Sequence, residues 1–363
     1  MSRQRLLGKL KGLYYPLVAI AVSLMFGGVF IALLGFDAVT AYKGLLKGAA
    51  GNPGAFCESM NKAVPIILTG ISFAIANSCG MVNLGAEGQL HIGAMCAVFA
   101  GVYVQLPPAM HPLFMVFAGA LGGALWGMIV GALKNRFNAN ELIVTIMLNY
   151  IATSLVEYFI SGPFRGQSTQ GNFPQSAMIC ESARIQKLFS GVRLHAGVIY
   201  VLIALVVYYL FLKKSKLGYE IRVVGMNPTA ADYAGISIRK SRLIAMAVAG
   251  AFAGIAGAIE LGAVQYRILE GFSSNFGYDG IAVALLGNGT SVGILLSGIL
   301  LGMLKAGANK MQVLTSVPSS TLQVIQGVLI IMVVGRKLFE FGGRGQGQKR
   351  RGANNALDSK GVK

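Results

Sequence analysis

The chain has 363 residues, of which 55% are hydrophobic and 12% charged, and its mean hydropathy is +0.64. Soluble domains carry about 25% charged residues, so this composition excludes a soluble protein and predicts an all-α polytopic membrane protein. The formal net charge of +18 does not indicate nucleic acid binding. Most basic residues fall in short links and tails, which favour the cytoplasmic side of a membrane and contact anionic lipid there.

The first half of the chain alternates apolar stretches with short polar links. A basic segment precedes the first apolar stretch, near residues 16–36, and therefore places the N-terminus in the cytoplasm. In the polar link that follows, residues 38–46 predict an interfacial helix. The next stretches long enough to span a bilayer are expected near residues 63–82, 89–106 and 110–133.

The second half follows the same plan. Further spans are expected near residues 142–160, 196–212, 243–264 and 322–334, with two apolar segments between 278 and 307. The loop over 161–195 is placed outside and the basic loop over 213–242 inside. About ten crossings put both termini in the cytoplasm of a multi-pass plasma-membrane protein. Residues 1–335 then form one transmembrane domain, and the basic tail 336–363 is expected to be disordered.

The loop over residues 213–242 contains seven basic and two acidic residues. Asn227 is a good N-cap, Pro228 suits the first helical position, and Gly235 suits the C-terminal stop. A helix of about two turns is not stable alone in water, so something is expected to pack on it. The loop is therefore predicted to be a docking surface, with the small residues Ala230 and Ala231 facing a partner.

One six-residue pattern occurs twice, at residues 83–88 (NLGAEG) and 275–280 (NFGYDG). By the expected topology, the first copy precedes an outward span and the second an inward one. An inverted repeat with glycine-broken half-helices near the pathway would give this arrangement. Chance similarity between two glycine-rich stretches is the alternative explanation.

Small residues recur every four positions in two of the expected spans. The stripes are Gly119, Gly123 and Gly127 in one span, and Gly250 and Gly254 in another. Such stripes let helix backbones approach to van der Waals contact, which favours association within lipid. A packing role is predicted for these five glycines.

A polar line runs along the expected span over residues 142–160. Thr145, Asn149, Thr153 and Glu157 follow one another at intervals of four. Polar groups that face lipid without a partner are costly, so this line should face protein or a water-filled path. Hydrogen bonding between helices and a solute pathway are the two interpretations.

A second polar group lies near the start of the span over residues 89–106. Glu87 and His91 are one helical turn apart, and a helix start near Gly88 would favour the Glu87 carboxylate. Both helix capping and solute contact are open for Glu87. Asn83 and Gln89 add neutral donors and acceptors, which suit a hydroxyl-rich neutral solute better than an ion.

Several classes of chemistry have no motif in this sequence. It contains no P-loop, no catalytic triad and no metal-ligand spacing, so no bound cofactor and no metal are expected. Cys79 and Cys96 lie in or beside apolar spans and are expected to act as small hydrophobic residues, whereas Cys57 and Cys180 fall in outer loops, where unpaired thiols are expected and a disulfide is the alternative. No span is predicted to carry a buried ladder of charges of the kind that proton-coupled carriers use.

Three segments together resemble the permeases of ABC importers for nucleosides and simple sugars. They are NLGAEGQLHIGA (83–94), ANELIVTIMLNYIA (139–152) and GYEIRVVGMNPTAADYAGI (218–236), and AGAFAGIAGAIE and DGIAVALLGNGTSVG match later spans of the same family. The resemblance covers roughly residues 63–335. Two departures are His91, where the family usually has an aliphatic residue, and the outer segment 183–189.

The resemblance implies the type II ABC importer permease fold and a set of partners. These are an ABC ATPase that uses ATP, a second permease subunit, expected to be a paralogue, and an extracytoplasmic solute-binding lipoprotein. Within such a permease, the polar residues expected to line the solute pathway are Asn83, Glu87, Gln89, Thr145, Asn149 and Thr153. The resemblance also implies an ATPase-coupling set of Gly218, Glu220, Arg222, Gly225, Asn227, Ala230, Ala231 and Gly235.

The expected solute is a nucleoside, because NLGAEGQ and TIMLNYIA are closer to nucleoside permeases than to ribose permeases. A simple sugar is the first alternative. A secondary carrier driven by an ion gradient is the less favoured one.

Overall fold

The computed structural model describes residues 18, 20–166, 173–188, 191, 193–318, 320–321, 323–328 and 330–332. These residues divide between two compact units, where the sequence predicted one transmembrane domain over 1–335. The smaller unit comes from both ends of the chain, Met1–Val39 and Val317–Lys363, and the larger is Thr40–Ser316. The expectations for the basic N-terminal segment and for the tail 336–363 lie outside the described residues.

The smaller unit contains two short apolar helices, Ile20–Leu33 and Gln323–Met332. They lie where the first and last spans were expected. The larger unit is described below by itself, because it carries all the predicted site residues.

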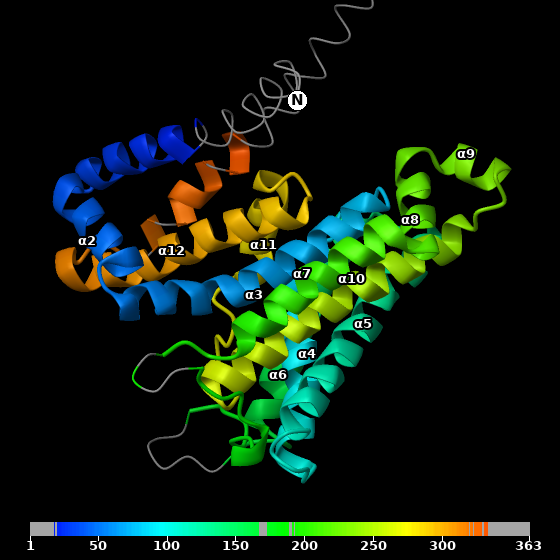
Figure 1. Ribbon diagram of the computed structural model, residues 1–363, viewed down its shortest axis with the longest axis horizontal. Helices are drawn as coiled ribbons and strands as arrows, with labels where there is room; N and C mark the ends of the chain where they lie inside the picture. The colour runs from blue at the N-terminus through cyan, green and yellow to red at the C-terminus, as the bar shows by residue number, and fades with distance from the viewer. Residues whose placement is uncertain are drawn as a thin grey trace, which may run out of the picture. The chain divides into compact units, whose positions relative to one another are not determined.

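The larger unit is a bundle of α-helices (Figure 1). In chain order its longer helices are α2 (Ala38–Ala50, which begins at the boundary of the unit), α3 (Pro53–Ser78), α4 (Ala86–Tyr103), α5 (His111–Phe137), α6 (Glu141–Ser161), α7 (Gly197–Lys214), α8 (Lys216–Met226), α10 (Ile238–Glu260) and α12 (Ser291–Thr315). The shorter elements are the 3-10 turn η1 (Glu181–Ala183), α9 (Pro228–Tyr233), the π-helical turn η2 (Leu261–Gln265) and α11 (Phe276–Leu286). The short helices α8 and α9 lie at one end of the unit, and the loop between α6 and α7 lies at the other.

Six of the described helices are long and apolar enough to cross a membrane: α3, α5, α6, α7, α10 with η2, and α12. This number falls short of the ten crossings expected from the sequence. The segment after residue 276 explains part of the difference. At 11 residues, α11 is about 16 Å long, roughly half the hydrocarbon thickness of a bilayer.

The polar link that follows the first apolar stretch, residues 37–62, is mostly helical. It contains α2 and the first ten residues of α3, whose start is well capped. Asn52 accepts a hydrogen bond from Ala55 N at 2.7 Å, and Pro53 occupies the first helical position. The interfacial helix expected at 38–46 corresponds to α2. Nearly every residue of α3 beyond Asn61 is buried, so this helix is the centre of the unit.

The glycine stripes lie where α5 packs against α10. A Cβ atom added to Gly123 would lie 2.8 Å from Gly254 Cα, and one added to Gly127 would lie 3.3 Å from Gly250 Cα. A Cβ on Gly119 would lie 2.7 Å from Ala258 Cβ. The two backbones are therefore too close for side chains at these positions, as small-residue stripes in membrane helices allow.

Candidate functional site

A cavity of about 240 Å³ opens between α4, α6 and the segment that leads into α11. Glu87 and His91 line it from α4, and Asn149, Thr153 and Glu157 line it from α6. The polar line predicted on one span and the polar group predicted on another therefore meet at one cavity. The remaining lining includes Phe272, Asn275 and Tyr278.

Glu87 stands in the first turn of α4, but its side chain caps a different helix. Its Oε2 accepts a hydrogen bond of 2.7 Å from the backbone N–H of Gly277, in the first turn of α11. An added Cβ on Gly277 would lie 2.6 Å from Glu87 Cα, so only glycine lets the two helix starts approach this closely. The two copies of the repeated sequence pattern thus lie at two helix starts that touch.

Asn149 joins three elements around the cavity. Its Oδ1 accepts from Gly88 N at 2.8 Å, and its Nδ2 donates to Leu84 O at 2.8 Å and to Tyr278 Oη at 3.1 Å. A buried amide side chain has two donor and two acceptor positions to satisfy, and Asn149 uses at least three of these four. The Asn149 side chain therefore fixes the start of α4 against α6.

Asn83 and Gln89 do not line this cavity, contrary to the expectation for the solute pathway. They pair through their side-chain amides: Asn83 Nδ2 donates to Gln89 Oε1 at 3.0 Å, and Gln89 Nε2 donates to Asn83 Oδ1 at 3.2 Å. Asn83 also donates to Ser72 Oγ, and its Oδ1 accepts from Gly85 N. Both side chains are fully buried, so the pair stabilises the α3–α4 connection.

Thr145 is also buried away from the cavity. Its hydroxyl donates back to Glu141 O at 2.7 Å within the same helix. A Cβ on Gly85 would lie 3.2 Å from Thr145 Cβ, so the residue packs against the chain just before α4. Of the six predicted pathway residues, the cavity therefore includes Glu87, Asn149 and Thr153.

His91 lies one turn after Glu87 and lines the same cavity. Its Nδ1 is 2.9 Å from Glu87 O, and because a carbonyl cannot donate, Nδ1 carries the hydrogen. In the neutral ring Nε2 is then an acceptor. Glu87 and His91 are connected through this backbone oxygen, and the Glu87 carboxylate bonds elsewhere.

The basic loop over residues 213–242 folds into α8 and α9. Asn227 caps α9, accepting from Ala230 N at 3.1 Å, with Pro228 in the first position and Gly235 in the left-handed region at φ +74°. These are the local features that the sequence predicted. The preceding helix α8 is an element that the sequence analysis missed, although Ser215 is a good N-cap and accepts from Gly218 N.

Ala231 does not face a partner, so the expectation for this residue is wrong. Its side chain is fully buried in an apolar cluster with Cys79, Ile221, Val224 and Ala245. The two most exposed large apolar side chains of α8 and α9 are those of Met226 and Tyr233, the latter 91% exposed. These two residues, with the exposed Asn227 and Ala230, form the surface that we call the coupling face.

The other predicted coupling residues hold α8 in place. A Cβ on Gly218 would lie 2.8 Å from Leu212 Cα in α7, and one on Gly225 would lie 2.9 Å from the carbonyl carbon of Ser78 in α3. Glu220 and Arg222 are half-buried, and Arg222 Nε donates to Gly218 O at 3.3 Å. Gly218 and Gly225 therefore serve close packing between α8 and two membrane-spanning helices.

An interior ion pair was missed by the sequence analysis, which expected no such buried charges. Lys305, in the middle of α12, pairs with Asp279 in the first turn of α11 and also donates to Ser274 O. Both side chains are at most 15% exposed. A lysine within an apolar run was the available signal, because such residues are rare in spans and need a partner.

The four cysteines are free in the structure, so Cys57 and Cys180 do not form the disulfide that the sequence left open. Within the described ranges, no cluster of three or more His, Cys, Asp or Glu side chains has the geometry of a metal site.

The described helices and the cavity are those of a polytopic α-helical membrane permease, with six long apolar helices in the described part of the chain, two helix starts that meet at a cavity, and a loop folded into two short helices. A family model described as "Branched-chain amino acid transport system / permease component" matches residues 56–334. The chain therefore belongs to this family of transport-system permeases.

Three curated relatives are similar along nearly the whole chain. The guanosine ABC transporter permease protein NupP of Bacillus subtilis is 39% identical over 336 residues, covering 92% of this chain and 96% of NupP. The glucose ABC transporter permease protein TsgB13 of Haloferax volcanii is 32% identical over 357 residues, covering 95% and 93%. The nucleoside ABC transporter permease protein NupB of Lactococcus lactis is 31% identical over 340 residues, covering 92% and 93%.

Proposed function

We propose that this permease translocates nucleosides across the plasma membrane as one subunit of an ATP-binding cassette importer. The observation that carries the proposal is the 39% identity to the guanosine permease NupP over 92% of the chain. The cavity agrees with a neutral, hydroxyl-bearing solute. Its lining combines the amide of Asn149, the hydroxyls of Thr153 and Tyr278, the imidazole of His91 and the carboxyl groups of Glu87 and Glu157, and no lysine or arginine that would attract a phosphate is among its described lining residues.

The test is uptake of labelled guanosine, adenosine and ribose by cells with the intact transport system and by cells in which this chain is deleted. We expect nucleoside uptake that depends on the chain, survives collapse of the proton gradient and stops on ATP depletion. Uptake of ribose, with no uptake of either nucleoside and no competition by them, would contradict the proposal. That outcome would establish the alternative, a simple-sugar permease, which the similarity to the glucose permease TsgB13 favours.

A second permease subunit is proposed to cover the open side of the cavity. Glu157, on α6, lines the cavity at its open side and is exposed. Only 33% of the apolar 18-residue stretch of α6 is buried within the chain. A carboxylate exposed to lipid is costly, so a protein surface or a water-filled path should lie against it. The family resemblance favours a paralogue over an identical copy, and co-purification of two differently tagged subunits would distinguish them.

The ATPase is proposed to be a separate subunit that binds the coupling face of Met226, Asn227, Ala230 and Tyr233. The sequence contains no P-loop, which agrees with ATP being bound and hydrolysed by a separate subunit. A small exposed apolar surface on a capped helix suits insertion into a groove. The solute-binding lipoprotein is proposed to dock at the opposite end, near the loop between α6 and α7.

The proposed topology places α8–α9 and both termini in the cytoplasm. Lys213, Lys214 and Lys216 flank the start of α8, in agreement with the positive-inside rule. We propose about ten membrane-crossing or re-entrant segments, with α11 re-entrant. The contact between the starts of α4 and α11 supports an inverted repeat built around residues 83–88 and 275–280.

A further inference from the structure

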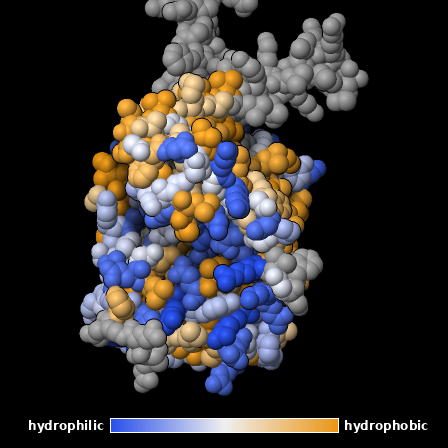
Figure 2. All heavy atoms as spheres, turned by 90° about the vertical axis from the view of Figure 1, so that its left-hand side faces the viewer, coloured by the Kyte–Doolittle hydropathy of each residue, from blue (hydrophilic) through white to orange (hydrophobic). Residues whose placement is uncertain are grey.

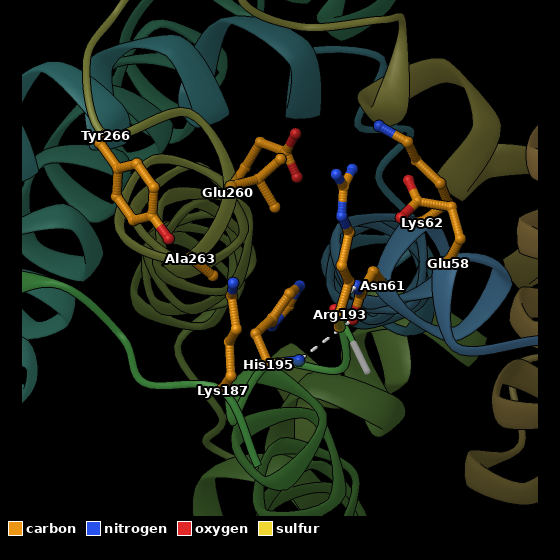
Figure 3. Close-up of a pocket in the computed structure, with 10 residues that line it drawn as sticks. Glu58, Asn61, Lys62, Lys187, Arg193, His195, Glu260, Ala263 and Tyr266 are labelled. Atoms are coloured by element: carbon orange, nitrogen blue, oxygen red, sulfur yellow. Dashed lines mark hydrogen bonds between the residues drawn. The ribbon is translucent and has the colours of Figure 1, made fainter. Parts of the chain in front are cut away.

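A second polar cavity, of about 290 Å³, lies at the end of the unit opposite α8–α9. We call it the outer cavity. Glu58, Asn61 and Lys62 line it from α3, Lys187, Arg193 and His195 from the loop before α7, and Glu260 and Tyr266 from the end of α10 and just beyond η2 (Figure 3). Figure 2 shows hydrophilic side chains gathered on the face that carries this loop.

The walls of the outer cavity are held by backbone hydrogen bonds. Lys187 and His195 form an antiparallel bridge, next to which Leu188 N donates to Leu194 O at 2.8 Å. Ile185 N donates to Gly262 O at 2.8 Å, which ties the loop to η2. The Asn61 amide donates to Arg193 O and accepts from His195 N, so α3 is tied to the same loop. The side chains therefore face a preformed space.

His195 presents a buried donor that has no acceptor among the described residues. Its Nδ1 accepts a hydrogen bond from Gly197 N at 3.1 Å, so in the neutral ring the hydrogen is on Nε2. Nε2 is buried and unpaired, and the side chain is only 3% exposed. Buried donors without a partner are rare and costly in folded proteins. A ligand acceptor would satisfy this group.

Glu260 presents the complementary group. Its side chain is 3% exposed, and the one hydrogen bond that the described residues give its carboxyl group is a long one, 3.3 Å, from Gln265 Nε2. A carboxyl group can accept several hydrogen bonds, so most of this capacity is unused. Within the described part of the chain, no ion pair joins Glu260 to the cations of the cavity. The Glu260 carboxyl group and the Arg193 guanidinium converge on one space in Figure 3.

The backbone beside the outer cavity is strained. Tyr266 adopts φ +59°, in the left-handed region that bulky side chains avoid, directly after the π-helical turn η2. Tyr266 N donates to Leu261 O at 2.7 Å, and Tyr266 O accepts from Ile179 N at 2.9 Å. Such turns and strained residues cluster at functional sites, because their cost is retained only where the geometry is used. Here the turn directs Tyr266 toward the cavity.

Among the lining groups, Glu260 supplies an acceptor and Arg193 and His195 supply donors, so a matching ligand presents a donor beside an acceptor. A 6-oxopurine base, as in guanosine and inosine, has an N1–H donor beside the O6 acceptor, with N7 as a further acceptor. Glu260 can accept from N1–H, and in guanine also from the amino group, while Arg193 or His195 donates to O6 and N7, as arginine does to guanine in nucleic acids. Adenine has an acceptor at N1, whose lone pair would oppose the Glu260 carboxyl oxygens.

We propose that the outer cavity is a binding site for 6-oxopurine nucleosides, through which the solute passes before the cavity at Asn149. The proposal rests on the proposed nucleoside transport and adds a site and a substrate class to it. A site built to hydrogen-bond N1–H and O6 rejects a base that lacks this pair, because its buried groups would then stay unpaired.

The test is binding of labelled guanosine to the assembled importer in lipid nanodiscs, without the solute-binding protein. Unlabelled guanosine and inosine should displace the label, and adenosine should do so at least ten times more weakly. Glu260→Gln and Arg193→Met should each weaken guanosine binding at least tenfold. Arg193 is exposed at the rim, so its variant is expected to fold even if the Glu260 variant does not. Glu181→Gln, at an exposed carboxylate of the same loop, is the matched control and should bind as the wild type does.

Equal displacement by adenosine, or unchanged binding in both the Glu260 and Arg193 variants, would overturn the outer site. Whole-cell uptake separates this failure from that of the proposed function. If cells take up nucleosides while the importer binds without a 6-oxopurine preference, the outer site is wrong and nucleoside transport stands. If cells take up no nucleoside through this system, the proposed function itself is wrong.

Discussion

The carboxylate of Glu87 and the backbone N–H of Gly277 are joined by a hydrogen bond of 2.7 Å, although 190 residues separate them in the chain. This bond places the positive ends of two helix dipoles beside one carboxyl group and holds the helix starts together. The Glu87 side chain thus forms part of the cavity wall and also fixes the backbone on the other side of it.

Glu87→Ala should loosen the start of α11, because Gly277 N would lose its acceptor in a buried place. A loss of this kind costs about 1–3 kcal/mol. We expect a lower unfolding temperature of the purified permease and slower nucleoside uptake. Glu87→Gln keeps an acceptor oxygen and should retain most of both. An alanine variant as stable and active as the wild type would show that the bond is dispensable.

Gly254→Leu should disrupt the contact between α5 and α10. An added Cβ there would already lie 3.1 Å from Gly123 Cα, and overpacking typically costs about 1–3 kcal/mol or more. The measurement is the yield of monodisperse permease in detergent. Gly54→Leu is the control, because an added Cβ at Gly54 meets only Asn52 Oδ1, at 3.4 Å. Equal yields for the two variants would mean that the stripe is not a close contact.

Substitutions on the coupling face should affect ATPase binding, whereas substitutions in the buried cluster beneath it should affect folding. Tyr233→Ala removes an exposed ring and should leave folding intact, while weakening ATPase binding by about 1–2 kcal/mol, roughly tenfold in affinity. Ala231→Glu would instead place a charge inside the cluster around Ile221 and Val224, and should reduce folded protein. Tyr103→Ala, also at an exposed ring but on α4, is the control. Normal ATPase binding by the Tyr233 variant would disprove the assignment of the face.

The ion pair between Lys305 and Asp279 makes the two residues energetically dependent on each other. Removing one partner leaves a buried charge without compensation, which costs about 3–5 kcal/mol. We therefore expect Lys305→Met and Asp279→Leu each to lower the unfolding temperature strongly, and the double variant to recover part of the loss. If the single effects simply add in the double variant, the two side chains do not interact.

Stability should fall on mild acidification because of His195. Burial, followed by the nearby positive charge of Lys62, lowers the pKa of His195 from 6.5 to about 4. Between pH 6.5 and 4 the unfolded chain then binds a proton that the folded chain does not, so stability is full above pH 6.5 and declines as the pH falls through this window. The effect amounts to about 1–3 kcal/mol. His195→Gln should show a smaller loss of unfolding temperature between pH 7 and 5, and an equal loss would exclude His195 as the cause.

Local features of the fold were predictable because they depend on residues close in sequence. Asn227, Pro228 and Gly235 each act on the backbone within one or two turns, and the structure has the short helix that they indicate. The glycine stripes are equally local, since intervals of four residues put them on one helix face. Family resemblance added the identity of the permease, which no local rule could supply.

The arrangement of the site residues could not be predicted, because it depends on contacts between residues that are far apart in the sequence. Asn83 and Gln89 had the right chemistry for a pathway, but their amides are paired with each other. Ala231 had the right size for a groove in a partner, but Cys79 and Ala245, far away in sequence, enclose it. Lys305 and Asp279 were not expected to be buried together, because only the tertiary fold brings α11 and α12 side by side.

The burial of Ala231 has a mechanical consequence. Because α9 packs into a cluster that includes Cys79, at the end of α3, and Ala245, in α10, a force applied to Tyr233 acts on both long helices at once. At 26 residues, α3 is about 39 Å long, and its far end carries Asn61 and Lys62 in the wall of the outer cavity. One end of α3 thus lies against the α8–α9 loop and the other end lies in the wall of the outer cavity, with Pro65 in the helix between them. A tilt of α3 as one body, with no bending at Pro65, would move Asn61, and the Arg193 backbone bonded to it, relative to Glu260.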